Sequence, residues 1–166
     1  RPETIHSRKK DNSLSEYSID DTNGTTIRLT GIAVGDKIGQ GKIQKMYSLD
    51  GRDGSFDGSD FQQGDVLVTE MTDPDWEPIM KMASAIITNK GGRTCHAAIV
   101  AREMGVPAIV GTENGTEVLF NGEEITVSCA EGDEGRVYDG IVPFKLKKTK
   151  LDKLPQPKTP IMLNVA

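Results

Sequence analysis

Apolar and polar positions alternate in the first part of the chain with the period of two that is typical of β-strands. The alternation is clearest at 26–30, and short runs separated by glycines follow at 31–34 and 41–47. A denser apolar run at 65–71 predicts a further strand. The first half of the chain is therefore expected to consist mainly of strands.

The pattern changes in the middle of the chain, where helices alternate with short apolar strands. Residues 72–75 combine a capping side chain, an early proline and acidic residues, which together predict a helix start. A second helix is predicted at 94–104, because Gly105 can adopt the left-handed capping conformation and a proline follows it. Apolar strands at 85–88 and 107–111 flank this helix and predict a βαβ unit with parallel strands.

Two more strands, at 123–129 and 135–138, complete the expected elements. The predicted fold class is α/β, with a compact mixed sheet or barrel and two or three helices. The folding unit is expected at 26–144. A polar leader precedes it, and a basic stretch rich in prolines follows at 145–160, so both flanks are interpreted as linkers.

Composition argues against nucleic-acid-binding, membrane and disulfide-rich proteins. With 166 residues, 36% of them hydrophobic, and 18 glycines, the chain is long enough for one turn-rich domain with a real core. The net charge of −5 argues against nucleic acid as a main partner. No apolar run has the length of a membrane span, and the two cysteines are too few for a disulfide framework. We therefore expect no membrane partner and a reduced, cytoplasmic setting.

The candidate chemistry lies in the run 91–96, Gly-Gly-Arg-Thr-Cys-His, at the start of the second predicted helix. His96 is expected at the second helical position, where unpaired backbone N–H groups and the helix dipole favour an anion. The dipole disfavours a protonated imidazole and stabilises a phosphorylated one, by ~0.3–1 kcal/mol each. Covalent catalysis through histidine divides one hard transfer into two easier ones. His96 is therefore predicted to accept a phosphoryl group and pass it on.

The neighbours of this histidine fit the same chemistry. Gly91 and Gly92 let the backbone approach a ligand closely and can form a concavity that binds anions. Arg93 supplies a forked cation suited to phosphate. Thr94 has two open roles, as the helix cap or as a hydroxyl that orients His96 or binds a phosphoryl oxygen.

Other kinds of site are weaker interpretations. A metal site would need more ligands than His96 and the two cysteines provide, and the loop at 50–64 lacks the oxygen spacing of a calcium site. The glycine pair is not followed by the Gly-Lys-Ser/Thr sequence that ends a phosphate-binding P-loop. Lys90 and Arg102 are left open as phosphate contacts or solvated charges, and His6 is expected to have no role.

The run 91–102 resembles the phosphohistidine signature of the phosphoenolpyruvate (PEP)-utilising enzymes. Residues 65–76 and 127–133 extend the resemblance, which covers about 31–140. It implies a swivelling β/β/α domain that carries the histidine between two distant sites. A non-catalytic interaction module with the same fold is the alternative, and the intact motif argues against it.

The flanks extend the same resemblance. Residues 1–4 resemble the end of the family's ATP-grasp domain, and 161–165 resemble the entry to its PEP/pyruvate barrel. The resemblance thus implies a linker at 1–25, the phosphohistidine domain at 26–144, and at 145–166 a linker with the start of a barrel. Because the chain also begins without methionine, we expect it to be part of a longer polypeptide.

The resemblance implies a reaction for the whole enzyme. ATP transfers its β,γ-diphosphate to His96, water removes phosphate, and the remaining phosphohistidine phosphorylates pyruvate to PEP. ATP and Mg²⁺ act in the full-length enzyme, so neither is expected to be bound by this domain alone. A regulatory kinase or phosphorylase can act on the position of Thr94, and Cys95 is expected to be a packing neighbour. Other dikinases of the family imply an alternative acceptor, such as phosphate, a glucan or an antibiotic.

Overall fold

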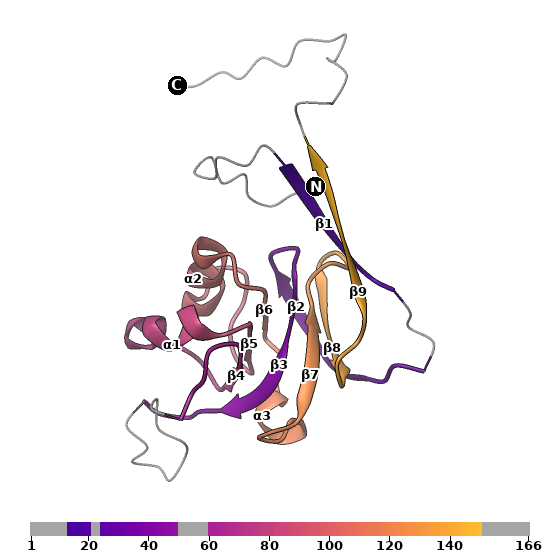
Figure 1. The fold of residues 1–166 in the computed structure, drawn as a ribbon. Coiled ribbons are helices and arrows are strands. Elements are labelled where there is room, and N and C mark those ends of the chain that lie inside the picture. Colours follow the sequence, from indigo (N-terminus) through magenta and orange to yellow (C-terminus); the bar gives the residue numbers. More distant parts are fainter. Residues whose placement is uncertain (1–12, 21–23, 50–59, 151–166) are drawn as a thin grey trace, which may run out of the picture.

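Seven strands form a closed barrel in the computed structural model, which describes residues 13–20, 24–49 and 60–150 (Figure 1). The barrel strands are β2 (Ile27–Val34), β3 (Ile38–Lys45), β4 (Val66–Thr69), β5 (Ala85–Thr88), β6 (Ala108–Val110), β7 (Glu124–Ser128) and β8 (Glu134–Asp139). Their order around the barrel is β2-β6-β5-β4-β3-β7-β8, and β8 pairs with β2 to close it. The expected α/β class is confirmed, and the sheet is a barrel.

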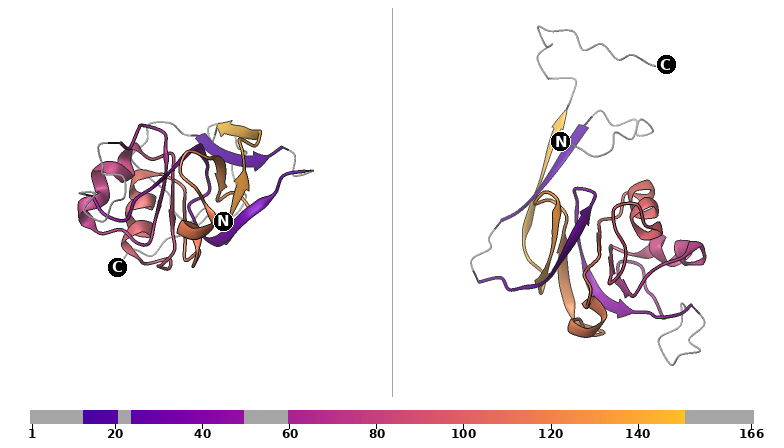
Figure 2. Two further views of the ribbon diagram at one scale, coloured as in Figure 1. Left: turned by 90° about the horizontal axis from the view of Figure 1, so that it is seen from below. Right: turned by 180° about the vertical axis from the view of Figure 1, so that it is seen from behind.

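Helices connect the parallel part of this barrel. Strand β4 is parallel to both β3 and β5, and β5 is parallel to β6, which confirms the predicted βαβ unit. The connections contain a 3-10 turn η1 (Pro74–Trp76), α1 (Glu77–Met82) and α2 (His96–Met104), and a short α3 (Gly115–Val118) follows β6. Helices α1 and α2 lie on the same side of the barrel in both views of Figure 2.

Two hydrophobic clusters hold the barrel and its helices together. One contains only barrel strands and neighbouring loop residues, and the other joins the strands to the helices. In β5, Ile87 belongs to the first cluster and Ile86 to the second, as expected for side chains that alternate along a strand. Trp76 is 4% exposed in the second cluster and is therefore a core residue. The helix that carries the candidate histidine is thus anchored on a packed sheet.

A two-stranded ribbon extends from the barrel (Figures 1 and 2). Strands β1 (Ser13–Ile19) and β9 (Phe144–Lys150) pair antiparallel along their whole length. The described parts of the predicted linkers at 1–25 and 145–160 therefore contain paired strands, and their role as linkers stays a prediction. The Tyr17 and Phe144 rings contact each other across the pair, and Glu16 of the first strand faces Lys147 of the second.

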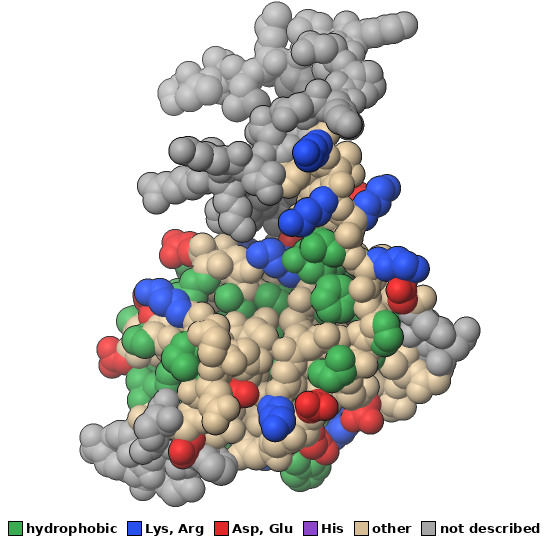
Figure 3. Space-filling model, in the orientation of Figure 1, with side chains coloured by type: hydrophobic (Ala, Val, Ile, Leu, Met, Phe, Trp, Pro, Cys, Tyr) green, Lys and Arg blue, Asp and Glu red, His purple; other side chains and the backbone are tan. Residues whose placement is uncertain are grey.

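Lysines give the ribbon its charge. Figure 3 shows blue side chains gathered over this part of the molecule. Lys145 Nζ is paired with Asp20 Oδ1, and Lys147 Nζ lies 3.9 Å from Glu16 Oε2. These exposed pairs contribute little to folding but favour one register of the two strands. In the described part of the chain, no helix combines the length and the apolar character that a membrane span requires.

Replacing Tyr17 with alanine tests whether the ribbon is held separately from the barrel. The centroids of the Tyr17 and Phe144 rings are 5.9 Å apart, so Tyr17→Ala is expected to weaken the ribbon by about 1 kcal/mol. Hydrogen exchange measures the result: amides of Ser13–Ile19 exchange faster, and barrel amides keep their protection. Tyr47→Ala, at an exposed tyrosine outside the ribbon, is the control. Equal loss of protection in the barrel would contradict the separation.

Candidate functional site

The second helix begins at His96, two residues later than the sequence suggests. Cys95 is the N-cap, with extended backbone angles and no capping hydrogen bond from its side chain. A turn in which Cys95 N donates to Gly92 O (3.1 Å) delays the helix start. His96 is therefore the first helical residue and not the second, and the capping role considered for Thr94 is wrong. The C-terminal prediction is confirmed, because Gly105 is left-handed with φ +68.

The imidazole of His96 has one engaged and one unengaged nitrogen. Nδ1 lies 3.0 Å from the hydroxyl oxygen of Thr72. Nε2 is buried and has no hydrogen-bond partner among the described residues. An unpaired buried polar atom is costly, and such atoms are found at sites with a functional role. The ring nitrogen without a partner is the one that remains available for chemistry.

Thr72 was not expected to touch the histidine. The sequence predicts a helix start at 72–75, and that start is present, with Asp73 as its cap and Pro74 at the first position. The Asp73 carboxylate accepts from Asp75 N (3.1 Å), which leaves the hydroxyl of Thr72 to contact His96. Parallel pairing of β4 with β5 brings the loops after these two strands together. That pairing was the only signal that could have predicted the contact.

The glycine pair forms the loop that leads into the helix. Gly91 has φ +116, and a Cβ there would lie 2.7 Å from Cys95 Sγ. A Cβ on Gly92 would meet nothing within 4 Å, so this side of the loop is open. Below the loop, the Thr88 hydroxyl donates to Lys90 O (2.7 Å) and fixes the backbone. The loop combines a constrained first glycine with an open second one, as an approach to a ligand requires.

Three cations surround this loop, and each has an identified contact. Arg93 Nη2 lies 3.0 Å from Asp133 Oδ1, in the turn before β8. Arg102 Nη1 donates to Arg93 O (2.6 Å) from the last turn of α2. Lys90 Nζ pairs with Glu70 Oε2 (2.9 Å). Arg102 therefore supports the loop backbone, and Lys90 is one half of a surface ion pair.

The remaining predicted site residue, Thr94, is exposed in the turn before the helix. Its predicted roles as a phosphate contact and as a regulated residue stay predictions. Cys95 is partly buried against the helix-side cluster. His6 and the 50–59 part of the acidic loop lie outside the described residues. Asp133 was not singled out from the sequence, because its relation to Arg93 depends on barrel closure.

The described cysteines do not form a metal site with His96. Cys129 donates its thiol to Ala108 O (3.2 Å) inside the barrel, and burial raises its pKa to about 12. A thiol with this pKa stays protonated near neutral pH and is a poor metal ligand. Within residues 13–20, 24–49 and 60–150, no three His, Cys, Asp or Glu side chains are grouped as metal ligands.

Replacing Thr72 with valine tests its contact with the ring. Thr72→Val keeps the shape of the side chain but removes the oxygen beside Nδ1, so phosphoryl loading of His96 is expected to slow by about 3- to 10-fold. Thr72→Ser keeps a hydroxyl and is expected to retain most of the rate. The measurement is the initial rate of loading with potassium phosphoramidate, a small phosphoryl donor. Equal rates for the valine variant and the unaltered chain would exclude an orienting role.

The barrel, the glycine loop and the helix-start histidine define a class of protein. Residues 61–132 match the family model described as "PEP-utilising enzyme, mobile domain", and this match contains the whole histidine loop and both helices beside it. The chain belongs to this family and carries its mobile domain.

The similarity to named relatives is more specific and extends over the full chain. The chain is 52% identical over 99% of its length to a phosphoenolpyruvate synthase of Aquifex aeolicus, covering 19% of that protein. It is 51% identical over 100% of its length to the Deinococcus radiodurans enzyme of the same name and 46% identical over 99% to that of Escherichia coli, covering 20% of each. The chain thus spans about a fifth of the length of these relatives.

Proposed function

We propose that this chain is the phosphocarrier domain of a phosphoenolpyruvate synthase, with His96 as the residue that carries the phosphoryl group. One observation carries the proposal: at the start of α2, Nδ1 of His96 is engaged by Thr72 while Nε2 has no partner among the described residues. A histidine held by one nitrogen and unengaged at the other has the arrangement of an oriented nucleophile. The relatives' shared name supports pyruvate as the acceptor.

The contact with Thr72 selects the reactive form of the ring. Nε2 can attack phosphorus only when it holds a lone pair, which in a neutral imidazole places the proton on Nδ1. In that tautomer, Nδ1–H donates to the hydroxyl oxygen of Thr72 across 3.0 Å. The threonine then orients the ring and stabilises the nucleophilic tautomer.

The burial of Nε2 requires that this nitrogen be uncovered before transfer. Reacting atoms must come within about 3–3.5 Å of each other, and a buried nitrogen cannot reach a donor on another domain. Movement of the atoms that cover Nε2 would expose it while Nδ1 keeps its contact with Thr72. The nucleophile is accordingly covered in the resting state.

The surroundings of the ring suit the product of the transfer. The first-turn N–H groups of α2 lack partners within the helix, and the Cys95 side chain does not cap them. These groups, the open side of Gly92 and the guanidinium of Arg93 would bind phosphoryl oxygens. A charge of about −1.5 to −2 on a phosphoryl group at neutral pH makes each of these interactions favourable.

The proposed reaction uses the rest of the polypeptide. His96 takes the β,γ-diphosphate of ATP and releases AMP; water then removes the terminal phosphate, and pyruvate receives the remaining phosphoryl group. In this proposal ATP and Mg²⁺ would act in the ATP-grasp domain and pyruvate in the barrel domain. Residues 1–25 and 145–166 would connect these domains to the carrier at 26–144. Thr94, exposed beside the site, would be the residue that a regulatory kinase modifies.

Position-specific labelling tests the proposal in the full polypeptide. With ATP labelled at the β-phosphorus, the label is expected on His96 and then in PEP. With ATP labelled at the γ-phosphorus, it is expected on His96 only transiently and afterwards in inorganic phosphate. A γ-label in PEP, or a β-label that reaches PEP without appearing on the carrier segment, would overturn the proposal. Omission of pyruvate is the control, since it should trap the β-label on the chain.

A further inference from the structure

The ion pair between Arg93 and Asp133 joins the loop before α2 to the turn between β7 and β8. Arg93 precedes His96 by three residues, whereas Asp133 lies in the turn between β7 and β8. Their side chains meet at 3.0 Å, with Arg93 40% exposed and Asp133 90% exposed. The guanidinium expected to contact the phosphoryl group is thus bound to a carboxylate.

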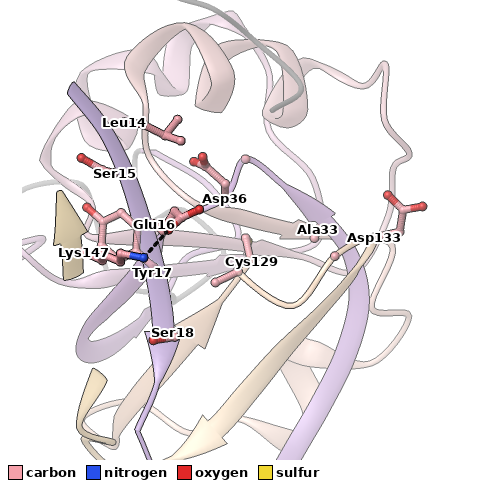
Figure 4. A pocket seen from close by; sticks show the side chains of 13 residues that line it. Leu14, Ser15, Glu16, Tyr17, Ser18, Ala33, Asp36, Cys129, Asp133 and Lys147 are labelled. Atoms are coloured by element: carbon pink, nitrogen blue, oxygen red, sulfur yellow. Dashed lines mark ion pairs between the residues drawn. The ribbon is translucent and has the colours of Figure 1, made fainter. Parts of the chain in front are cut away.

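Asp133 has no competing cation among the residues that share its cavity. It lies at the edge of a space of about 830 Å³ between the ribbon and the barrel. Figure 4 shows Asp133 apart from Lys147, whose ammonium group is directed to Glu16 of β1. The charge of Asp133 is therefore compensated by Arg93 from the histidine loop.

The backbone of Arg93 is held in place, so a change of partner would involve its side chain. Its backbone carbonyl accepts from Arg102 (2.6 Å), which holds the loop to the last turn of α2. An ion pair this exposed shifts an equilibrium by at most about fivefold, so it breaks readily. A phosphoryl group offers more charge than a carboxylate and three acceptor oxygens for the same guanidinium fork.

From this arrangement, and resting on the function proposed above, we propose that Asp133 is a positioning residue that exchanges Arg93 with the phosphoryl group. While His96 is free, Asp133 holds the guanidinium beside the loop. When His96 is phosphorylated, Arg93 leaves Asp133 and binds the phosphoryl oxygens. Arg93 is thus kept ordered near the loop while His96 is free, and it binds the phosphoryl group once His96 is phosphorylated.

The test follows the Arg93 side chain by NMR in the free chain and in the chain loaded with potassium phosphoramidate. Arg93→Lys identifies the Arg93 Nε–H signal by its loss. In the free chain, Asp133→Asn is expected to displace this signal, and Asp133→Glu to restore it. After loading, the signal of the unaltered chain is expected to move to a new position, which Asp133→Asn then shares.

Asp139→Asn is the matched control. Asp139 pairs with Arg28 at 2.9 Å and lies at the far end of β8, roughly 20 Å from Asp133. This variant is expected to leave the Arg93 signal unchanged in both states. An effect as large as that of Asp133→Asn would overturn a specific role for Asp133.

Two outcomes separate this inference from the proposed function. If the chain loads at His96 but the Arg93 signal stays where Asp133 holds it, the exchange is wrong and the phosphocarrier proposal stands. If His96→Ala loads as fully as the unaltered chain, the phosphocarrier proposal fails and the exchange fails with it. Because Asp133 is almost fully exposed, its replacement leaves the core intact.

Discussion

His96→Ala is expected to abolish phosphoryl loading of the chain, and His6→Ala is expected to leave it unchanged. The chain has two histidines, and the structure describes one of them, His96, which begins α2 with one ring nitrogen engaged and the other without a partner among the described residues. Alanine removes the nucleophile and keeps the helix, because alanine has the highest helix propensity. The measurement is acid-labile, base-stable phosphate on the chain after treatment with phosphoramidate, read by intact mass.

The pair of variants decides between a specific and a general reaction. If loading survives in His96→Ala and disappears in His6→Ala, the phosphoryl group is carried by His6, which contradicts the assignment to His96. Loading that falls equally in both would indicate unspecific modification of exposed imidazoles. Circular dichroism and thermal unfolding of both variants confirm that each is folded before the comparison is made.

Gly91→Ala is expected to have the second largest effect. Gly91 has φ +116, which side-chain-bearing residues rarely adopt, and the added Cβ would lie 2.7 Å from Cys95 Sγ. The strain costs about 1–3 kcal/mol, either as lost stability or as displacement of the cap residue next to His96. We expect a lower unfolding temperature and a loading rate reduced by at least about tenfold, measured on the same sample.

Gly92→Ala is the matched control for that change. The neighbouring glycine has open space at its Cβ position, so its replacement is expected to change stability by no more than about 0.5 kcal/mol. Any loss of loading in Gly92→Ala then reports obstruction of the approach to the histidine and not strain. Equal destabilisation by the two substitutions would show that the loop geometry is not what constrains Gly91.

The sequence predicts elements well where their signals are local. The glycine that caps α2, Gly105, directly follows the helix, and β5 and β6 lie close to it in the sequence. The βαβ unit can therefore be predicted from neighbouring residues alone. The ribbon has no such signal. Each of its strands is largely polar, and β1 pairs with a partner more than a hundred residues away, so neither strand shows a buried face in the sequence.

The candidate site divides in the same way. His96 and its glycines lie in one contiguous run, so residue types and spacing alone predict them. Thr72 and Asp133 reach the site from other loops, after parallel pairing and barrel closure have placed them. Helix α2 begins later than the sequence predicts because the turn closed by Gly92 O ends at Cys95, one residue before His96. Tertiary pairing therefore supplies what the motif lacks: the hydroxyl on the ring and the counter-ion of the arginine.

In the proposed function, Nε2 of His96 is the atom that carries the phosphoryl group. A chain labelled with ¹⁵N-histidine and loaded with phosphoramidate allows the phosphorus–nitrogen coupling to be read directly by NMR. We expect phosphorus to be bonded to Nε2 of His96, with Nδ1 still protonated and beside Thr72. Phosphorus bonded to Nδ1, or to any residue other than His96, would contradict it.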